Sequence, residues 1–433
     1  MKKYILKELE KGKIKNIYDE TFKSLLNRQE ENGNFPESFS GKYEGTFTRS
    51  VGAQSLFLNE LGYFDKSKKL LEGILNLINE QNLIRMPHWY NLKQPRIDMV
   101  DQIDGTFHII LAFADYCLKS NDKEFEDKYY YYIVKETIKG FSYPYFYDNN
   151  EKLPKLSANR EDIKDWVEKV TDTLPVFDKD ALNLIHNFYF EHSREYKMWN
   201  CFDMLSQSFA GAGIDKMIQL AEKRKDTKVS DWLKLKREAH LYGVDKNLTF
   251  EMNGKKMYLE MRVPTEKNPN GEPYDALGWP CFAPIAADWK GIDKDIYINT
   301  IEHLLLNSTI KDPVSKAEIN MKEYYSDGTI LPTQSLKMVG WSMEYLAYTK
   351  NYKRLADWIK FLTVNLEDGI LTEILMPKDK EGNQLVYRGK ILFDGDLPND
   401  INWGSEDRGS AEQCIWFCRS VLRVINELKK ECE

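Results

Sequence analysis

The chain has 433 residues and a formal net charge of -7, and 13% of its residues are Phe, Trp or Tyr. A negative chain without a basic stripe is not expected to bind nucleic acid, which needs a positive face for phosphate contacts. No apolar run is long enough to cross a membrane, and the basic N-terminus lacks the apolar core and cleavage site of a signal peptide. We therefore expect a cytoplasmic protein that binds neither nucleic acid nor membrane.

The six cysteines and six histidines are scattered along the chain, without the spacing of a disulfide framework or a metal site. We expect no bound metal and no cofactor. No Gly/Ser run, Pro-rich tract or long charge block marks a linker, so residues 1–433 are predicted to form a single domain.

Amphipathic helical patterns recur along the chain, mostly in pairs separated by short breaks. In chain order, helices are predicted over residues 14–29, 48–61, 66–79, 101–118, 123–140, 160–171, 199–224, 228–241, 296–306, 334–348, 352–363 and 409–429. Residues 242–289 are predicted to form strands and loops, including a hairpin whose two-residue turn is Asn253-Gly254.

Helix-turn-helix units at intervals of roughly 40–60 residues predict helical hairpins packed side by side. Six such hairpins closing into a ring form an all-α (α/α)6 toroid with short β-hairpin and loop insertions. An open α-solenoid of the same units is the alternative. The toroid is favoured because the loops between the hairpins are long and rich in Trp, Tyr, Asp and Glu, as loops around an active site are.

These loops combine flat aromatic rings with carboxylates and arginines. Sugars need that mixture, because their CH faces stack on rings while their hydroxyls hydrogen-bond to charged groups. Any single loop also fits helix capping and surface packing, but several loops of this kind favour carbohydrate binding. The candidate substrate-binding residues are Tyr43, Phe47, Arg49, Trp89, Tyr90, Asp101, Asp104, Arg194, Trp199, Trp279 and Trp403.

Glu191 follows three aromatic residues, Phe188, Tyr189 and Phe190, shortly before the helical pattern of residues 199–224. An aromatic pocket raises the pKa of a carboxyl group and keeps its proton available for donation. Alternatively, Glu191 is a solvated acid near a helix start, where the helix dipole favours a negative charge.

Five segments resemble, in the same order, segments of the glucoamylase-like six-hairpin glycosidases (glycoside hydrolase family 15 and relatives). They include counterparts of the family's Trp-x-Arg-Asp element, its Gln-Leu-Asp-x-Thr segment and its Gly-x-x-x-Glu loop. The segments are FTRSVGAQSLFLNELGYFDKSKKLLEGIL, DQIDGTFHIILAFADYCLKSND, FYFEHSREYKMWNCFDMLSQSFAGAGIDKMIQLAE, EYYSDGTILPTQSLKMVGWSMEYLA and DGILTEILMPKDKEG.

The resemblance implies catalytic roles for two carboxylates, with Glu191 as general acid and Glu373 as general base. It also implies that Arg49 holds the hydroxyls of the terminal sugar and that Asp104 is the acidic residue of the third-hairpin loop. Because an Ala-Glu-Gln occurs at residues 411–413 while no glutamine follows Glu373, Glu412 is the rival base.

The chain departs from the family pattern at two positions around Arg49. Phe47 stands where the pattern has Trp, and Ser50 stands where it has Asp. Both positions belong to the pocket for the terminal sugar, so the resemblance does not carry glucose specificity over to this chain.

The function implied is that of an inverting, exo-acting glycoside hydrolase on a small oligosaccharide. One alternative is another sugar-active (α/α)-barrel enzyme (an epimerase, an unsaturated-uronyl hydrolase or a lyase), for which His88, His108, Tyr90 and Tyr189 are the cues. The other is a non-catalytic helical toroid whose loop aromatics bind a partner.

Overall fold

The computed structural model describes residues 1–39, 44–81, 83, 85–94, 96–100, 102–142, 160–173, 181–192, 197–366, 371, 373–387, 390–405 and 409–430. Most of these residues are helical. The helices are α1 (Lys2–Lys11), α2 (Lys13–Arg28), α3 (Thr48–Leu61), α4 (Phe64–Glu80), α5 (Ile103–Ser120), α6 (Lys123–Phe141), α8 (Arg160–Thr173), α9 (Met204–Arg224), α10 (Thr227–Asn247), η2 (Trp279–Phe282), α11 (Ala283–Ala287), α12 (Lys294–Ser308), α13 (Leu336–Tyr348), α14 (Tyr352–Asn365) and α15 (Ala411–Lys430).

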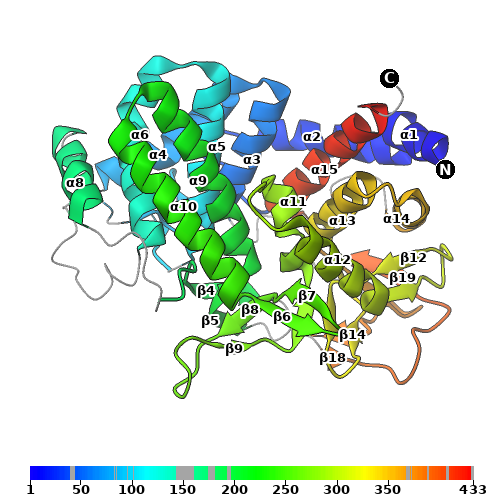
Figure 1. The fold of residues 1–433 in the computed structure, drawn as a ribbon. Helices are drawn as coiled ribbons and strands as arrows, with labels where there is room; N and C mark the ends of the chain where they lie inside the picture. Colours follow the sequence, from blue (N-terminus) through cyan, green and yellow to red (C-terminus); the bar gives the residue numbers. More distant parts are fainter. Residues whose placement is uncertain are drawn as a thin grey trace.

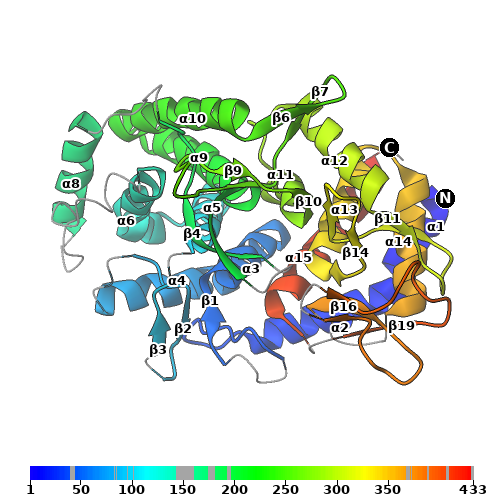
Figure 2. The same ribbon diagram turned by 90° about the horizontal axis from the view of Figure 1, so that it is seen from below.

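The helices form two concentric rings (Figure 1, Figure 2). The inner ring runs α3, α5, α9, α11, α13 and α15, and α15 packs back against α3 to close it. Helices α2, α4, α6, α10, α12 and α14 lie outside these, while α1 and α8 are additional. This arrangement confirms the predicted (α/α)6 toroid, and the contact between α15 and α3 rules out an open solenoid.

Short, capped turns lead from α3, α5, α9 and α13 to the outer helix that follows each. Gly62, in the left-handed conformation at φ 77°, ends α3. Asp122, Asp226 and Asn351 cap α6, α10 and α14 by accepting a hydrogen bond from a first-turn N–H. These turns gather at one end of the toroid, and those after α3, α5 and α9 lie at the top of Figure 1.

The connections from outer to inner helices are long and carry the strands, which gather at the other end (Figure 1). Every strand pairing among the described residues is antiparallel. The strands are β1 (Thr46–Phe47), β2 (Trp89–Asn91), β3 (Arg96–Asp98), β4 (Asn187–His192), β5 (Lys197–Asp203), β6 (Thr249–Met252), β7 (Lys255–Tyr258), β8 (Met261–Val263), β9 (Glu272–Pro273), β10 (Ala276–Gly278), β11 (Thr309–Lys311), β12 (Glu318–Asn320), β13 (Glu323–Tyr325), β14 (Ile330–Leu331), β15 (Gln334–Ser335), β16 (Ile374–Lys378), β17 (Val386–Tyr387), β18 (Lys390–Ile391) and β19 (Asn402–Ser405).

The predicted hairpin turn is confirmed between β6 and β7. Asn253 and Gly254 have φ angles of 53° and 72°, as a two-residue turn with two positive φ values requires.

Several predicted helices begin too early, and the helices α1, η2 and α11 were missed. The helix predicted from Trp199 begins at Met204, because β5 pairs with β4 on one side and β8 on the other. The helix predicted from Gln334 begins at Leu336, because β15 pairs with β16. Residues 279–287, predicted as strand and loop, form η2 and the short inner helix α11.

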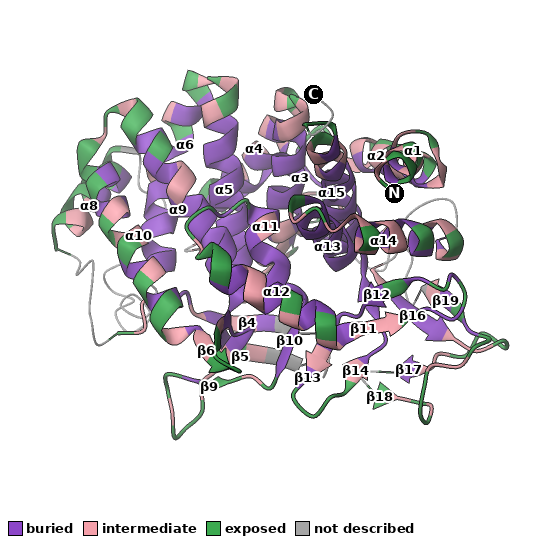
Figure 3. Cartoon of the chain, turned by 45° about the vertical axis from the view of Figure 1, so that its right-hand side comes forward, coloured by how far each residue is buried: buried purple, intermediate pink, exposed green. Residues whose placement is uncertain are grey.

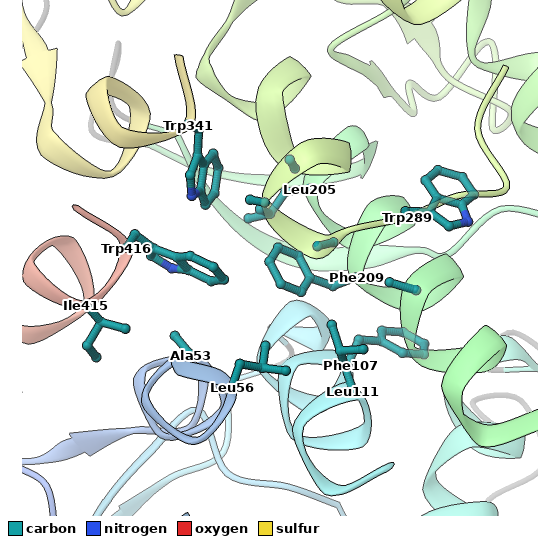
Figure 4. Packing of buried hydrophobic residues seen from close by; sticks show 14 of the residues in the cluster. Ala53, Leu56, Phe107, Leu111, Leu205, Phe209, Trp289, Trp341, Ile415 and Trp416 are labelled. Atoms are coloured by element: carbon teal, nitrogen blue, oxygen red, sulfur yellow. The ribbon is translucent and has the colours of Figure 1, made fainter. Parts of the chain in front are cut away.

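Apolar side chains fill the middle of the inner ring (Figure 4), and burial is concentrated on the inner helices (Figure 3). Phe209, Trp341 and Trp416 pack against one another from α9, α13 and α15, while Phe107 of α5 packs outward against Phe141 of α6. Helices α3 and α5 approach closely at Gly52, where a Cβ atom would stand 2.6 Å from the backbone carbon of His108. The inner ring is therefore a packed core, and polar chemistry is left to its ends.

Candidate active site

Charged side chains meet at the end of the toroid that carries the long loops. Arg49, Asp104, Lys337 and Glu412 are each the second residue of an inner helix, in α3, α5, α13 and α15 respectively. Because these helices all begin at the same end, their first turns lie side by side. We call these four residues the charged array.

The charged array is continuous across four helices. Arg49 Nη1 lies 3.2 Å from Asp104 Oδ2, and Arg49 Nε lies 2.9 Å from Glu412 Oε2. Lys337 Nζ lies 3.0 Å from Glu412 Oε1. Only Arg49 exposes more than a tenth of its side chain, at 15%. The array therefore orients a partly exposed guanidinium with buried carboxylates on either side of it.

Glu412 is held as a carboxylate by two cations. Burial alone would raise its pKa, but Arg49 and Lys337 outweigh burial and hold the pKa at about 2. Each of its carboxylate oxygens accepts a hydrogen bond from one of these cations. Glu412 therefore stays ionised at neutral pH.

Lys337 was not predicted as a site residue. A cation in the first turn of a helix opposes the helix dipole, so its place at the start of α13 needs compensation. The carboxylate of Glu412 stabilises the Lys337 cation by an ion pair. The ring of Trp279 stabilises it further, because its centroid lies 4.2 Å from Lys337 Nζ. Its signal in the sequence is a lysine inside the apolar run SLKMVGW.

Glu37 was also not predicted as a site residue. It contacts Ser50, the residue that replaces the Asp of the family pattern. Its carboxylate accepts hydrogen bonds from Ser50 Oγ at 2.5 Å, from Ser410 Oγ at 2.5 Å and from the backbone N–H of Glu412 at 3.0 Å. Burial raises its pKa, and the charge of Glu412 raises it further. Ser50 stands where the family pattern has an Asp. Its hydroxyl donates to the carboxyl group of Glu37, which comes from a preceding loop.

The predicted general acid lies in a strand, and the first of the two predicted bases directly precedes one. Glu191 is in β4, where its backbone pairs with Met198, and its side chain lies outside the described residues. Glu373 is half-buried and directly precedes β16, whose Ile374 pairs with Ser335 immediately before α13. The backbone of Glu373 is thus close to the helix that carries Lys337.

Trp279 connects β4 to the charged array. Phe190, next to Glu191 in the chain, stacks on Trp279 with ring centroids 6.1 Å apart. Trp279 is only 5% exposed, and its ring also contacts Lys337. Trp279 is therefore a buried residue that packs against Lys337, not an exposed ring.

Three other predicted aromatic residues lie in the small sheet of β1, β2 and β3. Phe47 pairs with Trp89 across this sheet, and both are half-buried. Tyr90 is completely buried, and burial raises the pKa of its hydroxyl. Phe47 and Trp89 are thus the members of this group that are partly exposed.

The remaining predicted residues have different surroundings. Trp199 is half-buried, with its ring edge-on to Tyr274 at 5.6 Å. Trp403 is 8% exposed, donates from Nε1 to Asp312 Oδ1 at 2.8 Å and packs against Phe361 of α14. The predicted residues Tyr43, Asp101 and Arg194 lie outside the described residues.

In the described part of the chain, no three His, Cys, Asp or Glu side chains are grouped so that they could hold a metal ion. None of the helices in that part is long and apolar enough to cross a membrane.

No family model matches the sequence, and no curated protein matches it. Its fold does match solved structures, and these are six-hairpin glycosidases. A bacterial glucoamylase complexed with acarbose aligns with a TM-score of 0.57 at 10% identity, covering 95% of this chain and 55% of the glucoamylase chain. The chain therefore spans about half the length of that protein.

Two further solved structures match over nearly the full length of both chains. A wild-type glycosidase aligns with a TM-score of 0.55 at 11% identity, over 98% of this chain and 97% of its own. A metal-independent alpha mannosidase from Streptococcus pneumoniae, in complex with alpha-1,6-mannobiose, aligns with a TM-score of 0.58 at 11% identity over the same shares. The resemblance to six-hairpin glycosidases is thus confirmed for the fold.

Proposed function

We propose that this chain is an inverting glycoside hydrolase that removes sugars from one end of a small oligosaccharide. The observation that carries the proposal is the charged array, which orients the guanidinium of Arg49 where the long loops meet. An oriented guanidinium is a suitable donor for neighbouring sugar hydroxyls. Support also comes from the shared fold with a glucoamylase and an alpha mannosidase.

Glu191 is the proposed general acid and Glu373 the proposed general base. The geometry of Glu412 favours Glu373 in the second role. Both oxygens of Glu412 accept from cations, and a pKa of about 2 makes a poor proton acceptor near neutral pH. Glu412 instead serves to position Arg49.

In the proposed reaction, the protonated Glu191 donates to the leaving glycosidic oxygen as the bond to the anomeric carbon breaks. Glu373 takes a proton from a water molecule that attacks the anomeric carbon from the opposite face, which inverts its configuration. This requires the two carboxyl groups to stand roughly 6.5–9.5 Å apart, with room for the water between them. Arg49 binds hydroxyls of the terminal sugar, and Phe47, Trp89 and Trp199 offer ring surface to its CH faces.

The test is sugar release from a panel of gluco- and manno-oligosaccharides by wild type, Glu191→Gln and Glu373→Gln. Wild type should release a terminal sugar, and each variant should lose about 10²–10⁴-fold or more in rate, because proton transfer contributes that much. Glu381→Gln is the matched control, since Glu381 is exposed beyond β16, and it should keep full activity. NMR of the first product should show the anomer opposite to the substrate's.

Two results would contradict the proposal. One is the absence of release from every sugar in the panel by wild type. The other is undiminished release by Glu373→Gln with an unchanged melting temperature, which would remove the assignment of the base.

A further inference from the structure

His88 is fixed in the backbone beside the first turn of α3. Its N–H donates to the carbonyl of Asp98 at 2.8 Å, and its carbonyl accepts from the N–H of Thr48 at 3.1 Å. Thr48 precedes Arg49, the central member of the charged array. The imidazole is therefore carried by a backbone that is held on both sides, as a binding group needs to be.

The imidazole is mostly buried and lacks a hydrogen-bond partner among the described residues. Its side chain is 15% exposed, and the ring of Phe47 contacts it edge-on with centroids 5.0 Å apart. Both ring nitrogens are buried without a hydrogen bond in the described part of the chain. Asp98 Oδ2 lies 3.6 Å from Nδ1, a long polar contact that raises the pKa of the imidazole but exceeds ordinary hydrogen-bond distance. Buried polar groups are normally paired, so an unpaired imidazole beside a candidate site is available to bind a ligand group.

The charge state of the ring suits a neutral partner. Burial lowers the pKa of His88, and the nearby Arg49 lowers it further, although Asp104 and Asp98 act in the opposite direction. A neutral imidazole offers one N–H donor and one nitrogen acceptor. A sugar hydroxyl also donates and accepts, whereas a protonated imidazole could only donate.

A second unpaired polar atom lies in the same region. Asp104 is completely buried, and its Oδ1 has no hydrogen-bond partner in the described chain, while Oδ2 binds Arg49. Asp104 interacts electrostatically with His88. An acceptor, a neutral imidazole and a guanidinium are thus gathered at the start of α3 and α5.

We propose that His88 is a specificity-determining residue, and that its imidazole hydrogen-bonds one hydroxyl of the terminal sugar that Arg49 holds. This inference rests on the proposed function, because it assigns His88 a contact with the same substrate. A site that hydrogen-bonds a hydroxyl through a buried group rejects the analogue that lacks it, since the group is then left unpaired.

The experiment measures binding instead of turnover. Isothermal titration calorimetry is carried out with Glu373→Gln as the parent, using the best oligosaccharide of the panel and its monodeoxy analogues at each hydroxyl of the terminal sugar. One analogue should bind the parent at least about 10-fold more weakly than the full sugar. Adding His88→Phe should weaken binding of the full sugar by about that factor and reduce the penalty for this one analogue to nearly nothing.

Two further variants separate a contact from a structural effect. His88→Gln, which keeps a donor and an acceptor, should restore part of the deoxy penalty. His303→Phe, in the outer helix α12, should leave every penalty unchanged. Melting temperatures establish that each variant is folded. If His88→Phe does not fold, the comparison of His88→Gln with the parent tests the proposal.

Each remaining outcome overturns a distinct statement. If the parent binds sugars and the His88 variants keep the full pattern of deoxy penalties, His88 does not contact the sugar, and the proposed function is untouched. If neither wild type nor the parent binds any sugar of the panel, the proposed function falls and the role of His88 falls with it.

Discussion

Arg49 Nε lies 2.9 Å from Glu412 Oε2, and this ion pair joins α3 to α15, the first and last helices of the inner ring. The two residues are 363 positions apart in the chain. The contact that closes the ring therefore also orients the guanidinium at the centre of the candidate site.

Replacing Arg49 should destabilise the protein strongly. Arg49→Met leaves the buried carboxylate of Asp104 without its cation and removes one of the two cations of Glu412. Breaking a buried pair on one side costs about 3–5 kcal/mol. Urea denaturation measures the loss, and Lys380→Met, which breaks the exposed pair with Asp400, should leave stability nearly unchanged. Equal effects of the two substitutions would mean that the array adds no stability.

Glu412 should make stability depend on acid pH. Its pKa falls from an ordinary 4.5 to about 2 on folding, which corresponds to about 3 kcal/mol at neutral pH. Because the folded pKa is the lower one, this contribution is present above about pH 5 and is lost as the pH falls toward 2. Glu412→Gln should be less stable than wild type at pH 7, and the difference should narrow from pH 5 to pH 3. A difference that is constant over this range would contradict the assignment.

An added anion should distinguish the two candidate bases. In Glu373→Ala, azide or formate can occupy the space of the missing carboxylate and should restore part of the lost turnover. In Glu412→Ala the same anions should restore little, because the lost function is the orientation of Arg49. Initial rates with and without added azide measure this. Rescue confined to Glu412→Ala would reverse the two roles.

Gly52 should be intolerant of a methyl group. In Gly52→Ala the new Cβ would stand 2.6 Å from the backbone of His108, so α3 and α5 would have to separate, at a cost of about 1–3 kcal/mol. Gly213→Ala in α9 is the matched control, since its new Cβ would meet its nearest neighbour at an ordinary 3.5 Å. Thermal unfolding of both variants tests the prediction, which fails if Gly52→Ala is the more stable of the two.

Two tryptophans from the predicted site should behave differently. Trp403→Phe removes the donor to Asp312 and should lower stability by about 1–3 kcal/mol with little change in KM. Trp199→Ala removes half-exposed ring surface beside β4 and should raise KM more than it lowers stability. Kinetics and urea denaturation of both variants test this, and a raised KM in Trp403→Phe would return that residue to the substrate site.

The sequence alone predicted the features that depend on near neighbours in the chain. Helical periodicity identified most helices to within a few residues, and Asn253-Gly254 identified a hairpin turn. The paired spacing of helices also indicated the toroid. For the helices and the hairpin turn, the residues that determine the structure lie within one or two turns of each other.

The tertiary structure alone decided features that depend on distant partners. Trp199 has helical spacing with its successors, but β5 is a strand because β4 and β8 pair with it. The role of Lys337 depends on Glu412, and the role of Glu37 depends on Ser410. Both partners lie at the start of α15, the last helix of the inner ring. The sequence shows that a residue has a carboxylate, but it does not show whether the partner of that carboxylate is water or a buried cation. Only the packing of helices far apart in the chain determines which partner it has, and hence its charge and its role.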